Sequence, residues 1–250
     1  LPYDIPRNIS VRDVVFYDND SALGPYGSAF PGSIVVRDSC VFANGSGLHF
    51  SSENTNIEID NVDFLENLGS PFSLSLMDGD TPKATIRDSV FVDNGSGIIS
   101  ESGYFTIIDS VIQGTKSGYA LTSFVAEWGD TGQVTLDNVE FDDNRGGGIY
   151  TNRRLTVNDT GFGNTTGAPA VTMVEDITDP NDVESTFVDV AFTNNVVAIA
   201  PDPEMHILQF TRTAMGTGID DNGVDFEGCA ESFDVLDGVT VDPAAGPCPN

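Results

Sequence analysis

Three arginines near the middle of the sequence, Arg145, Arg153 and Arg154, are the side chains best suited to chemistry. Removal of a proton next to a carboxylate requires a base, and a neighbouring cation stabilises the enolate that forms. The arginines are candidates for that cation, which would indicate a lyase reaction. The alternative interpretation is that they only offset part of a very acidic surface.

Two adjacent carboxylates, Asp142 and Asp143, could act as a general acid and base. They stand immediately before Asn144, where a turn is expected, and this position favours a solvated turn.

An oxygen-rich string near the C-terminus, formed by Asp220, Asn222, Asp225 and Glu227, carries ligand types that Ca²⁺ prefers. Its spacing is not that of an EF-hand loop. We therefore expect no cofactor, and calcium is the only ion that this string leaves open.

A nine-residue pattern that recurs along most of the chain must position these groups. Residues 86–94, Ile-Arg-Asp-Ser-Val-Phe-Val-Asp-Asn, are its best example. The third position is Asp or Asn, the sixth is a large apolar residue and the ninth is Asn or Thr. Eight copies occur, with third positions at Asp13, Asp38, Asn61, Asp88, Asp109, Asn138, Asp159 and Asp189. Their sixth positions are Phe16, Val41, Phe64, Phe91, Ile112, Phe141, Phe162 and Phe192, and their ninth positions are Asn19, Asn44, Asn67, Asn94, Thr115, Asn144, Thr165 and Asn195.

The spacing of the copies is typical of a solenoid. Successive third positions lie 25, 23, 27, 21, 29, 21 and 30 residues apart, in the range of solenoid repeats. Apolar and polar residues alternate within the copies, as in half-buried strands, and Asp or Asn-Gly marks sharp turns that tolerate a left-handed backbone. These features predict an all-β fold, a single-stranded parallel β-helix of about eight to nine coils. The unequal coil lengths favour the right-handed form.

Stacked coils would place identical positions about 4.8 Å apart. The sixth positions would then form an aromatic core, and the ninth-position asparagines would pair in a buried ladder. We expect an irregular N-terminal cap over residues 1–8, the β-helix over 9–212 and an irregular tail over 213–250. Acidic loops at 77–82, 126–131 and 175–182 are expected to line up along one edge.

The repeat resembles that of the pectin-lyase-like superfamily of right-handed parallel β-helices, over about Ile9 to Phe192. That resemblance implies the fold, and it raises the hypothesis of an enzyme that cleaves or epimerises acidic polysaccharides. The catalytic strings of such enzymes are missing. Asp142-Asp143 stands alone, His49 is followed by Phe50, and Asp202-Pro203-Glu204-Met205-His206 departs from the Asp-Pro-His-Asp of alginate epimerases.

The charge balance restricts the partners. The chain of 250 residues has 39 acidic and 10 basic residues, which gives a net charge of −29. Such a charge argues against nucleic acids and anionic membranes as partners. The sequence contains no apolar run long enough to span a membrane.

Cysteines and glycosylation sequons suit an extracellular location. Cys229 and Cys248 flank part of the tail, and we expect them to form a disulfide, whereas Cys40 should be a free thiol in the core. Six Asn-X-Ser/Thr sequons begin at Asn8, Asn19, Asn44, Asn94, Asn158 and Asn164. Asn19, Asn44 and Asn94 belong to the predicted ladder, so we expect glycans on Asn158, Asn164 and Asn8 instead.

Three outward positions of the short coils, His49, Ile99 and Tyr150, form a column that could stack against an apolar or sugar partner. The alternative is ordinary surface. Taken together, the sequence predicts a non-catalytic, extracellular or cell-surface β-helix module. It would be a structural or adhesive part of a filament, coat or matrix, with copies of itself, other proteins or glycans as partners. The alternatives are a carbohydrate-active enzyme (lyase, epimerase or hydrolase) and a soluble glycan-binding module.

Overall fold

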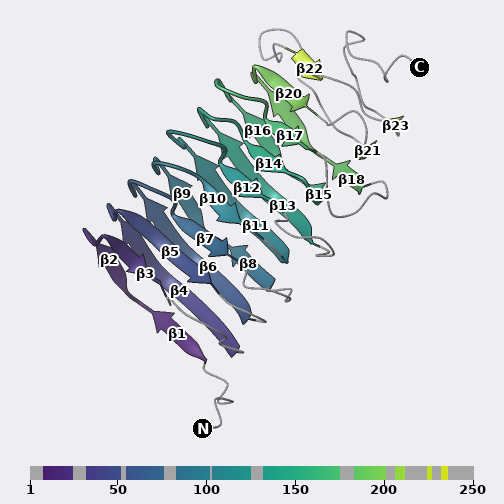
Figure 1. Cartoon of the computed structure of the whole chain (residues 1–250). Helices are drawn as coiled ribbons and strands as arrows, with labels where there is room; N and C mark the ends of the chain where they lie inside the picture. Colours follow the sequence, from purple (N-terminus) through teal and green to yellow (C-terminus); the bar gives the residue numbers. More distant parts are fainter. Residues whose placement is uncertain are drawn as a thin grey trace.

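The computed structural model describes residues 8–24, 32–51, 55–75, 83–101, 103–124, 132–174, 183–200, 206–211, 224–226 and 232–235. Their regular structure consists of β-strands that pair in parallel and wind into a solenoid, with the coils stacked along one axis (Figure 1). The predicted fold class is therefore confirmed as an all-β parallel solenoid. No helix in the described segments is long and apolar enough to cross a membrane.

Two sheets form the walls. The larger sheet contains β1 (Ile9–Arg12), β2 (Val15–Tyr17), β4 (Gly32–Phe42), β6 (Thr55–Leu65), β8 (Lys83–Arg87), β9 (Val90–Val92), β11 (Tyr104–Gln113), β13 (Gln133–Asp142), β15 (Arg154–Asn158), β16 (Gly161–Gly163), β18 (Val183–Val188), β19 (Ala191–Thr193), β21 (His206–Thr211) and β23 (Ser232–Val235). The smaller sheet contains β3 (Ser21–Leu23), β5 (Ser46–Ser51), β7 (Phe72–Ser75), β10 (Ile98–Ser100), β12 (Leu121–Ser123), β14 (Ile149–Thr151), β17 (Val171–Met173), β20 (Val197–Ala200) and β22 (Val224–Phe226).

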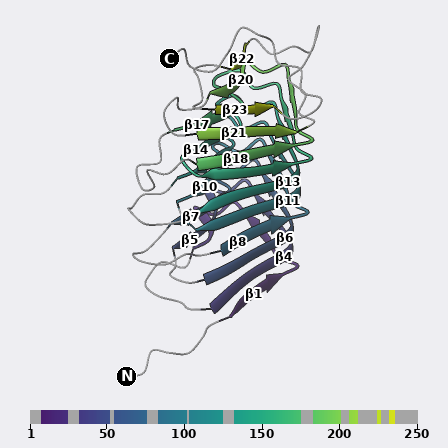
Figure 2. The same ribbon diagram turned by 90° about the vertical axis from the view of Figure 1, so that its right-hand side faces the viewer.

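The coil count slightly exceeds the expected eight to nine. The smaller sheet has nine strands, one from each coil, and β23 begins a further coil among the described residues. Figure 2 shows the strands of the larger sheet lying side by side in sequence order. β22 and β23 lie within residues 213–250, where an irregular tail was expected, and each pairs in parallel with a strand of the preceding coil.

Each copy of the pattern bends the chain twice. All eight third positions have a positive φ, between 46° and 56°, a conformation that Asp and Asn tolerate better than most residues. A second positive φ occurs one residue before the ninth position, as at Asp93 and Gly114. The Asn-Gly pairs were expected to adopt a left-handed backbone, but Gly95 does not have a positive φ. Glycine is required there because the backbone of the preceding coil lies too close for a side chain. A Cβ on Gly95 would lie 1.8 Å from the carbonyl oxygen of Leu68 in the preceding coil.

The predicted aromatic core is present. Phe64 and Phe91 stack with ring centroids 4.5 Å apart, and Phe162 lies 4.9 Å from Phe141 and 5.0 Å from Phe192. All five side chains are fully buried. Parallel register places each ring directly on the equivalent residue of the next coil.

The asparagine ladder is also present and buried. The backbone N–H and Nδ2 of Asn44 donate to Oδ1 of Asn67 at 3.0 and 3.1 Å, and the same groups of Asn67 donate to Asn94 at 3.0 and 2.9 Å. Asn44 and Asn94 are therefore buried in the ladder, as predicted. Asn19 belongs to the same ladder through Asn44, but it is exposed in the first coil.

A second ladder, formed by hydroxyl groups, lies at the fourth position of the pattern. Each hydroxyl donates to the carbonyl oxygen two residues earlier and accepts a backbone N–H from the preceding coil. Its members are Ser39, Ser89, Ser110 and Thr160. The two ladders satisfy buried polar groups at both bends, so the register is fixed from coil to coil.

Candidate functional site

The three arginines proposed for lyase chemistry do not form one site. Arg153 is fully buried, and its Nη1 and Nη2 donate to the carbonyl oxygens of Gly103 at 2.6 Å and Phe124 at 2.8 Å. Arg145 is exposed in the turn before β14, whereas Arg154 is exposed at the first position of β15, after that strand. Arg153 therefore holds backbone segments together inside the solenoid and faces no substrate.

Of the paired carboxylates, Asp142 ends β13 and Asp143 lies in the bend that follows, where a turn was expected. Asp143 is exposed with φ of 49°. Both oxygens of Asp142 accept hydrogen bonds, from Asn164 at 2.7 Å and from Gln113 at 3.3 Å. These side chains and Asn194 line an open polar hollow of about 760 Å³. The carboxylate of Asp142 is thus engaged by amides, and Asp143 is exposed, which is the arrangement expected of a solvated turn.

The column of His49, Ile99 and Tyr150 exists, but it is not apolar. Register places Ser73 between His49 and Ile99, and Thr122 between Ile99 and Tyr150. All five side chains are half-buried, and His49 Nδ1 contacts Ser73 Oγ. Along this column, the residues of the short coils alternate with Ser73 and Thr122 of the long coils. The column is therefore partly polar and partly apolar.

Cys40 is a free thiol but does not lie in the core, so that part of the prediction was wrong. It is half-buried on the outer side of β4, between the inward residues Ser39 and Val41. Burial, followed by the nearby charge of Asp63, raises the pKa of the thiol. The fifth position of the pattern points outward, and Cys40 occupies that position.

The glycosylation candidates lie on the surface of the solenoid. Asn8 and Asn164 are exposed, and Asn158 is half-buried on the outer side of β15. Oδ1 of Asn8 accepts hydrogen bonds from Ser33, and Nδ2 of Asn164 donates to Asp142. Glycosylation at these three positions remains a prediction.

Several candidates cannot be placed. Cys229, Cys248 and all three acidic loops lie outside the described residues, as do Asp220, Asn222 and Glu227 of the calcium string. Only the backbone of Asp225 is described, in β22. Within the described segments, no group of three or more His, Cys, Asp and Glu side chains could hold a metal ion.

A site that sequence reasoning missed lies on the larger sheet. We define the basic face as the outward side chains that precede the first bend of each coil, from β1 to β15. Five of the ten basic residues of the chain lie there among the described residues, namely Arg12, Arg37, Lys83, Arg87 and Arg154. Among the described residues of this chain of net charge −29, this surface carries the most basic side chains, which favours an anion.

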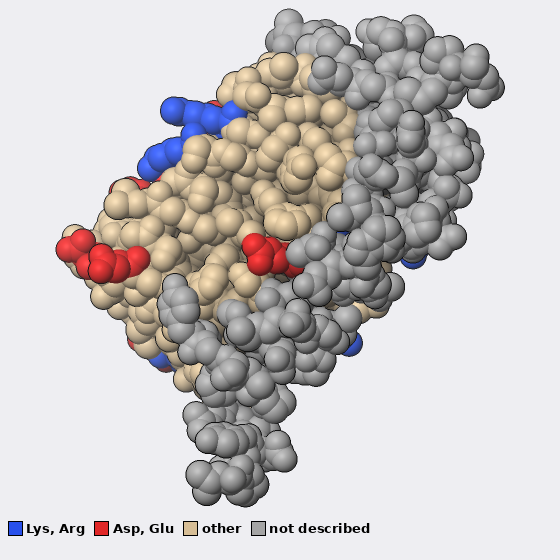
Figure 3. Space-filling view, in the orientation of Figure 1, with Lys and Arg blue, Asp and Glu red and all other residues tan. Residues whose placement is uncertain are grey.

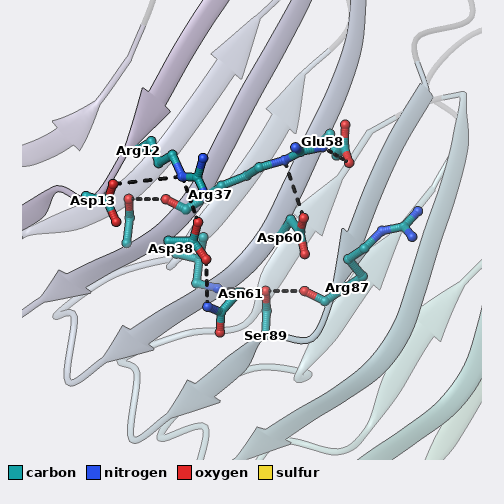
Figure 4. A network of polar contacts seen from close by, with 11 residues as sticks. Arg12, Asp13, Arg37, Asp38, Glu58, Asp60, Asn61, Arg87 and Ser89 are labelled. Carbon is teal, nitrogen blue, oxygen red and sulfur yellow. Dashed lines mark hydrogen bonds and ion pairs between the residues drawn. The ribbon is translucent and has the colours of Figure 1, made fainter.

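Two of these arginines are neutralised by neighbours (Figure 4). Arg12 Nε lies 2.9 Å from Asp38 Oδ2, and Arg37 Nη2 lies 2.6 Å from Glu58 Oε1. Arg37 Nε lies 3.3 Å from Asp60 Oδ2 as an ion pair. The hydrogen bond and charge of Glu58 raise the pKa of Arg37. These pairs fix the geometry of the first coils but leave little charge for a ligand.

The next coil differs, because its two cations line a groove. Lys83 and Arg87 border a groove of about 330 Å³ together with Glu58 and Thr85. Lys83 Nζ lies 5.7 Å from the ring centroid of Tyr104, and Arg87 Nε is buried with no hydrogen-bond partner in the described structure. No ion pair within 4.0 Å joins either cation to a described carboxylate. The groove can therefore bind a carboxylate, sulfate or phosphate group.

Strand alternation could have revealed this groove in the sequence. Lys83, Thr85 and Arg87 have the same parity as Ser33, Val35 and Arg37, so all six point outward. What the sequence could not show is that Asp60 lies closer to Arg37 than to Arg87.

The basic face continues toward the C-terminus as a column of threonines. Thr85, Thr106, Thr135, Thr156 and Thr186 occupy one register position on five successive strands.

Comparisons of the chain with protein-family models, curated proteins and solved structures find no match. What the chain can bind is therefore argued from its own side chains.

Proposed function

We propose that the chain is a non-catalytic, extracellular or cell-surface β-solenoid module that forms a structural or adhesive part of a larger assembly. The observation that carries this proposal is the unbroken register of the coils. The core and both ladders fix each coil on the next, and the outer face repeats one side-chain position on strand after strand, as in the threonine column.

Rigidity and repetition are what an assembly contact requires. Nine coils spaced about 4.8 Å apart give a wall about 38 Å long. Weak contacts that repeat along such a wall add to one another, since each contact raises the effective concentration of the next. A long repeating face therefore suits a filament, coat or matrix.

The proposal includes an oxidising, extracellular environment. In that environment we propose a disulfide between Cys229 and Cys248 and glycans on Asn158, Asn164 and Asn8. We propose no cofactor. Membership of the pectin-lyase-like superfamily and right-handed winding of the coils are further parts of it. The varied coil lengths, 21 to 30 residues, support the right-handed form.

A second candidate function is favoured by the groove beside Lys83 and Arg87. Two cations that form no ion pair with a described carboxylate, in a very acidic protein, suit an anionic glycan, bound either for its own sake or for cleavage. This candidate covers the glycan-binding module and the carbohydrate-active enzyme.

Turnover and binding assays separate the two candidates. The purified chain is incubated with pectins, alginates and sulfated glycans, with and without calcium, and its arrangement in the native source is imaged. We expect no turnover, and lateral copies or a coat in the images. Turnover that is lost in Lys83→Gln and Arg87→Gln but kept in Arg145→Gln, an exposed arginine outside the groove, would overturn the structural proposal.

A further inference from the structure

An apolar strip lies on the outer side of the larger sheet, between the two bends of the first four coils. We define it as Val15, Tyr17, Phe42, Leu65, Val90 and Val92. Tyr17, Phe42, Leu65 and Val92 occupy one register column on successive strands. Val15 is 70% exposed and Tyr17 is 59% exposed, which is far above the exposure of a core residue. The Tyr17 and Phe42 rings stack with centroids 5.3 Å apart.

The pattern of the repeat does not require this apolar character. The same column continues through Gln113, Asp142, Gly163 and Thr193 in the later coils. Those residues are polar or small, although the core beneath them is as aromatic as before. The apolar side chains are thus a property of the outer surface of the first four coils. The strip is partly exposed, since Phe42, Leu65, Val90 and Val92 are half-buried. Contiguous apolar surface that solvent reaches marks interaction sites.

An acidic row borders the strip at the second bend. In the first, third and fourth coils, Asp18, Glu66 and Asp93 hold left-handed positions one residue beyond the strip column, and all three are exposed. Ala43 holds that position in the second coil. No basic group of the described chain lies within 4.0 Å of the three carboxylates. Asp63 adds a fourth exposed carboxylate within the strip itself.

The border at the first bend is different in charge. Asp13 and Asp38 lie there, but Arg12 pairs with both. Asp88 on the same border is exposed and forms no ion pair within 4.0 Å with a described basic group, so it is the one unpaired carboxylate there. The unneutralised charge around the strip is therefore concentrated on the side of the second bend. Figure 3 shows one face of the solenoid, on which most described residues are uncharged; basic side chains lie at its upper left, and acidic ones at its left edge and near its middle.

We infer that the apolar strip docks a basic, amphipathic segment of a partner protein, with its apolar side chains on the strip and its lysines or arginines along the acidic row. The dimensions fit one such segment. The column spans about 14 Å over four coils at about 4.8 Å each, and the apolar turns of a helix repeat every ~5.4 Å. Three turns of an amphipathic helix would match the four coils.

A second copy of this chain suits the strip less well. It would bring a net charge of −29 and the same acidic row to the interface. Like charges facing each other disfavour that pairing, most strongly at low salt. A basic partner instead gains from both the apolar contact and the opposite charge.

This inference deepens the proposed function by naming the class of partner, and it rests on the chain being an assembly module. The test uses the full chain and a fluorescently labelled 14-residue peptide of leucine and lysine at amphipathic helical spacing. Fluorescence anisotropy at 50 and 500 mM NaCl measures the Kd. Two control peptides replace every leucine by serine or every lysine by glutamate.

We expect the leucine–lysine peptide to bind at least ten-fold more tightly than either control. Tyr17→Ser combined with Leu65→Ser should weaken it about ten-fold at both salt concentrations. Glu66→Gln combined with Asp93→Asn should weaken it mainly at 50 mM NaCl. Gln113→Ser, in the polar part of the same column, should leave the Kd unchanged.

Two results would overturn the inference. One is equal binding of the serine–lysine peptide, since bulk charge alone would then explain it. The other is a dimer of the chain in sedimentation velocity that Tyr17→Ser and Leu65→Ser abolish, because a second copy would then occupy the strip. Failure of the proposed function is seen separately, as glycan turnover that these variants do not affect.

Discussion

Replacing Asn67 with alanine tests whether the asparagine ladder stabilises the solenoid. Asn67 is fully buried and its side chain makes four hydrogen bonds. Oδ1 accepts from the backbone N–H and Nδ2 of Asn44, and Nδ2 donates to the carbonyl oxygen of Val41 and to Oδ1 of Asn94, all between 2.9 and 3.1 Å.

The expected cost follows from the groups left without a partner. Nδ2 of Asn44 keeps bonds to two carbonyl oxygens, and Oδ1 of Asn94 still accepts the backbone N–H of Asn67. The buried backbone N–H of Asn44 loses its acceptor, and such an orphan costs about 1–3 kcal/mol. With the remaining lost bonds at about 1 kcal/mol each, Asn67→Ala should lower the free energy of unfolding by about 2–5 kcal/mol.

Equilibrium unfolding in urea, followed by circular dichroism at fixed salt, measures this difference. Asn19→Ala is the matched control, because Asn19 holds the same ladder position in the first coil but is exposed. It should cost less than about 1 kcal/mol, as exposed substitutions usually do. Asn67→Thr should fall between the two, since threonine serves in the ladder at Thr165. Equal costs for Asn67→Ala and Asn19→Ala would refute the argument.

The other predictions concern the core, a buried charge, a carboxylate and a thiol. Phe91→Ala should lower the free energy of unfolding by about 3–5 kcal/mol, because removal of a buried, stacked ring leaves a cavity. A loss below about 1 kcal/mol in a urea titration would contradict this prediction. Arg153→Met should destabilise by about 2–4 kcal/mol, since two buried carbonyl oxygens lose charged donors, whereas unchanged stability would show that the guanidinium is not structural. Hydrogen bonds from Asn61 and then Arg12 lower the pKa of Asp38. The ionised carboxylate of Asp38 should therefore stabilise the fold at and above the ordinary pKa of aspartate, and this stabilisation should be lost as the pH falls through the lowered pKa of Asp38. A carbon NMR titration should show a higher pKa for Asp38 in the Asn61→Ala variant than in the unchanged chain. The raised pKa of Cys40 should slow its alkylation by iodoacetamide at pH 8 relative to the urea-unfolded chain, and equal rates would argue against burial.

The fold was predictable because eight copies of one pattern carry the same signals for bends, core positions and ladder positions. An Asp or Asn at each third position predicts a left-handed bend, and all eight adopt one. The phenylalanines and asparagines at fixed offsets predict columns, and parallel register produces them. The outward direction of Cys40 was also readable, since it follows the inward fourth position of the pattern by one residue.

Other features were not readable, because they depend on contacts between distant parts of the chain. The burial of Arg153 requires space that glycines provide, and a Cβ on Gly132 would lie 2.3 Å from its Nη1. No local pattern separates Arg153 from the exposed Arg154 beside it. Similarly, β22 and β23 belong to the sheets through pairing with the preceding coil, although the repeat pattern has already faded there.

The outward positions of the repeat vary without disturbing the core. The residues at these positions differ between the first four and the last four copies. The third, fourth, sixth and ninth positions build the bends, ladders and aromatic stack. The second and seventh positions face outward and are under no such constraint. In the first four copies the second position is Arg12, Arg37, Asp60 and Arg87, and the seventh is Tyr17, Phe42, Leu65 and Val92. In the last four copies the same positions hold Ile108, Asp137, Asn158 and Val188, and Gln113, Asp142, Gly163 and Thr193. Because the core is equally regular in both halves, core packing does not account for the basic and apolar surfaces of the first half, whereas contact with a partner there would.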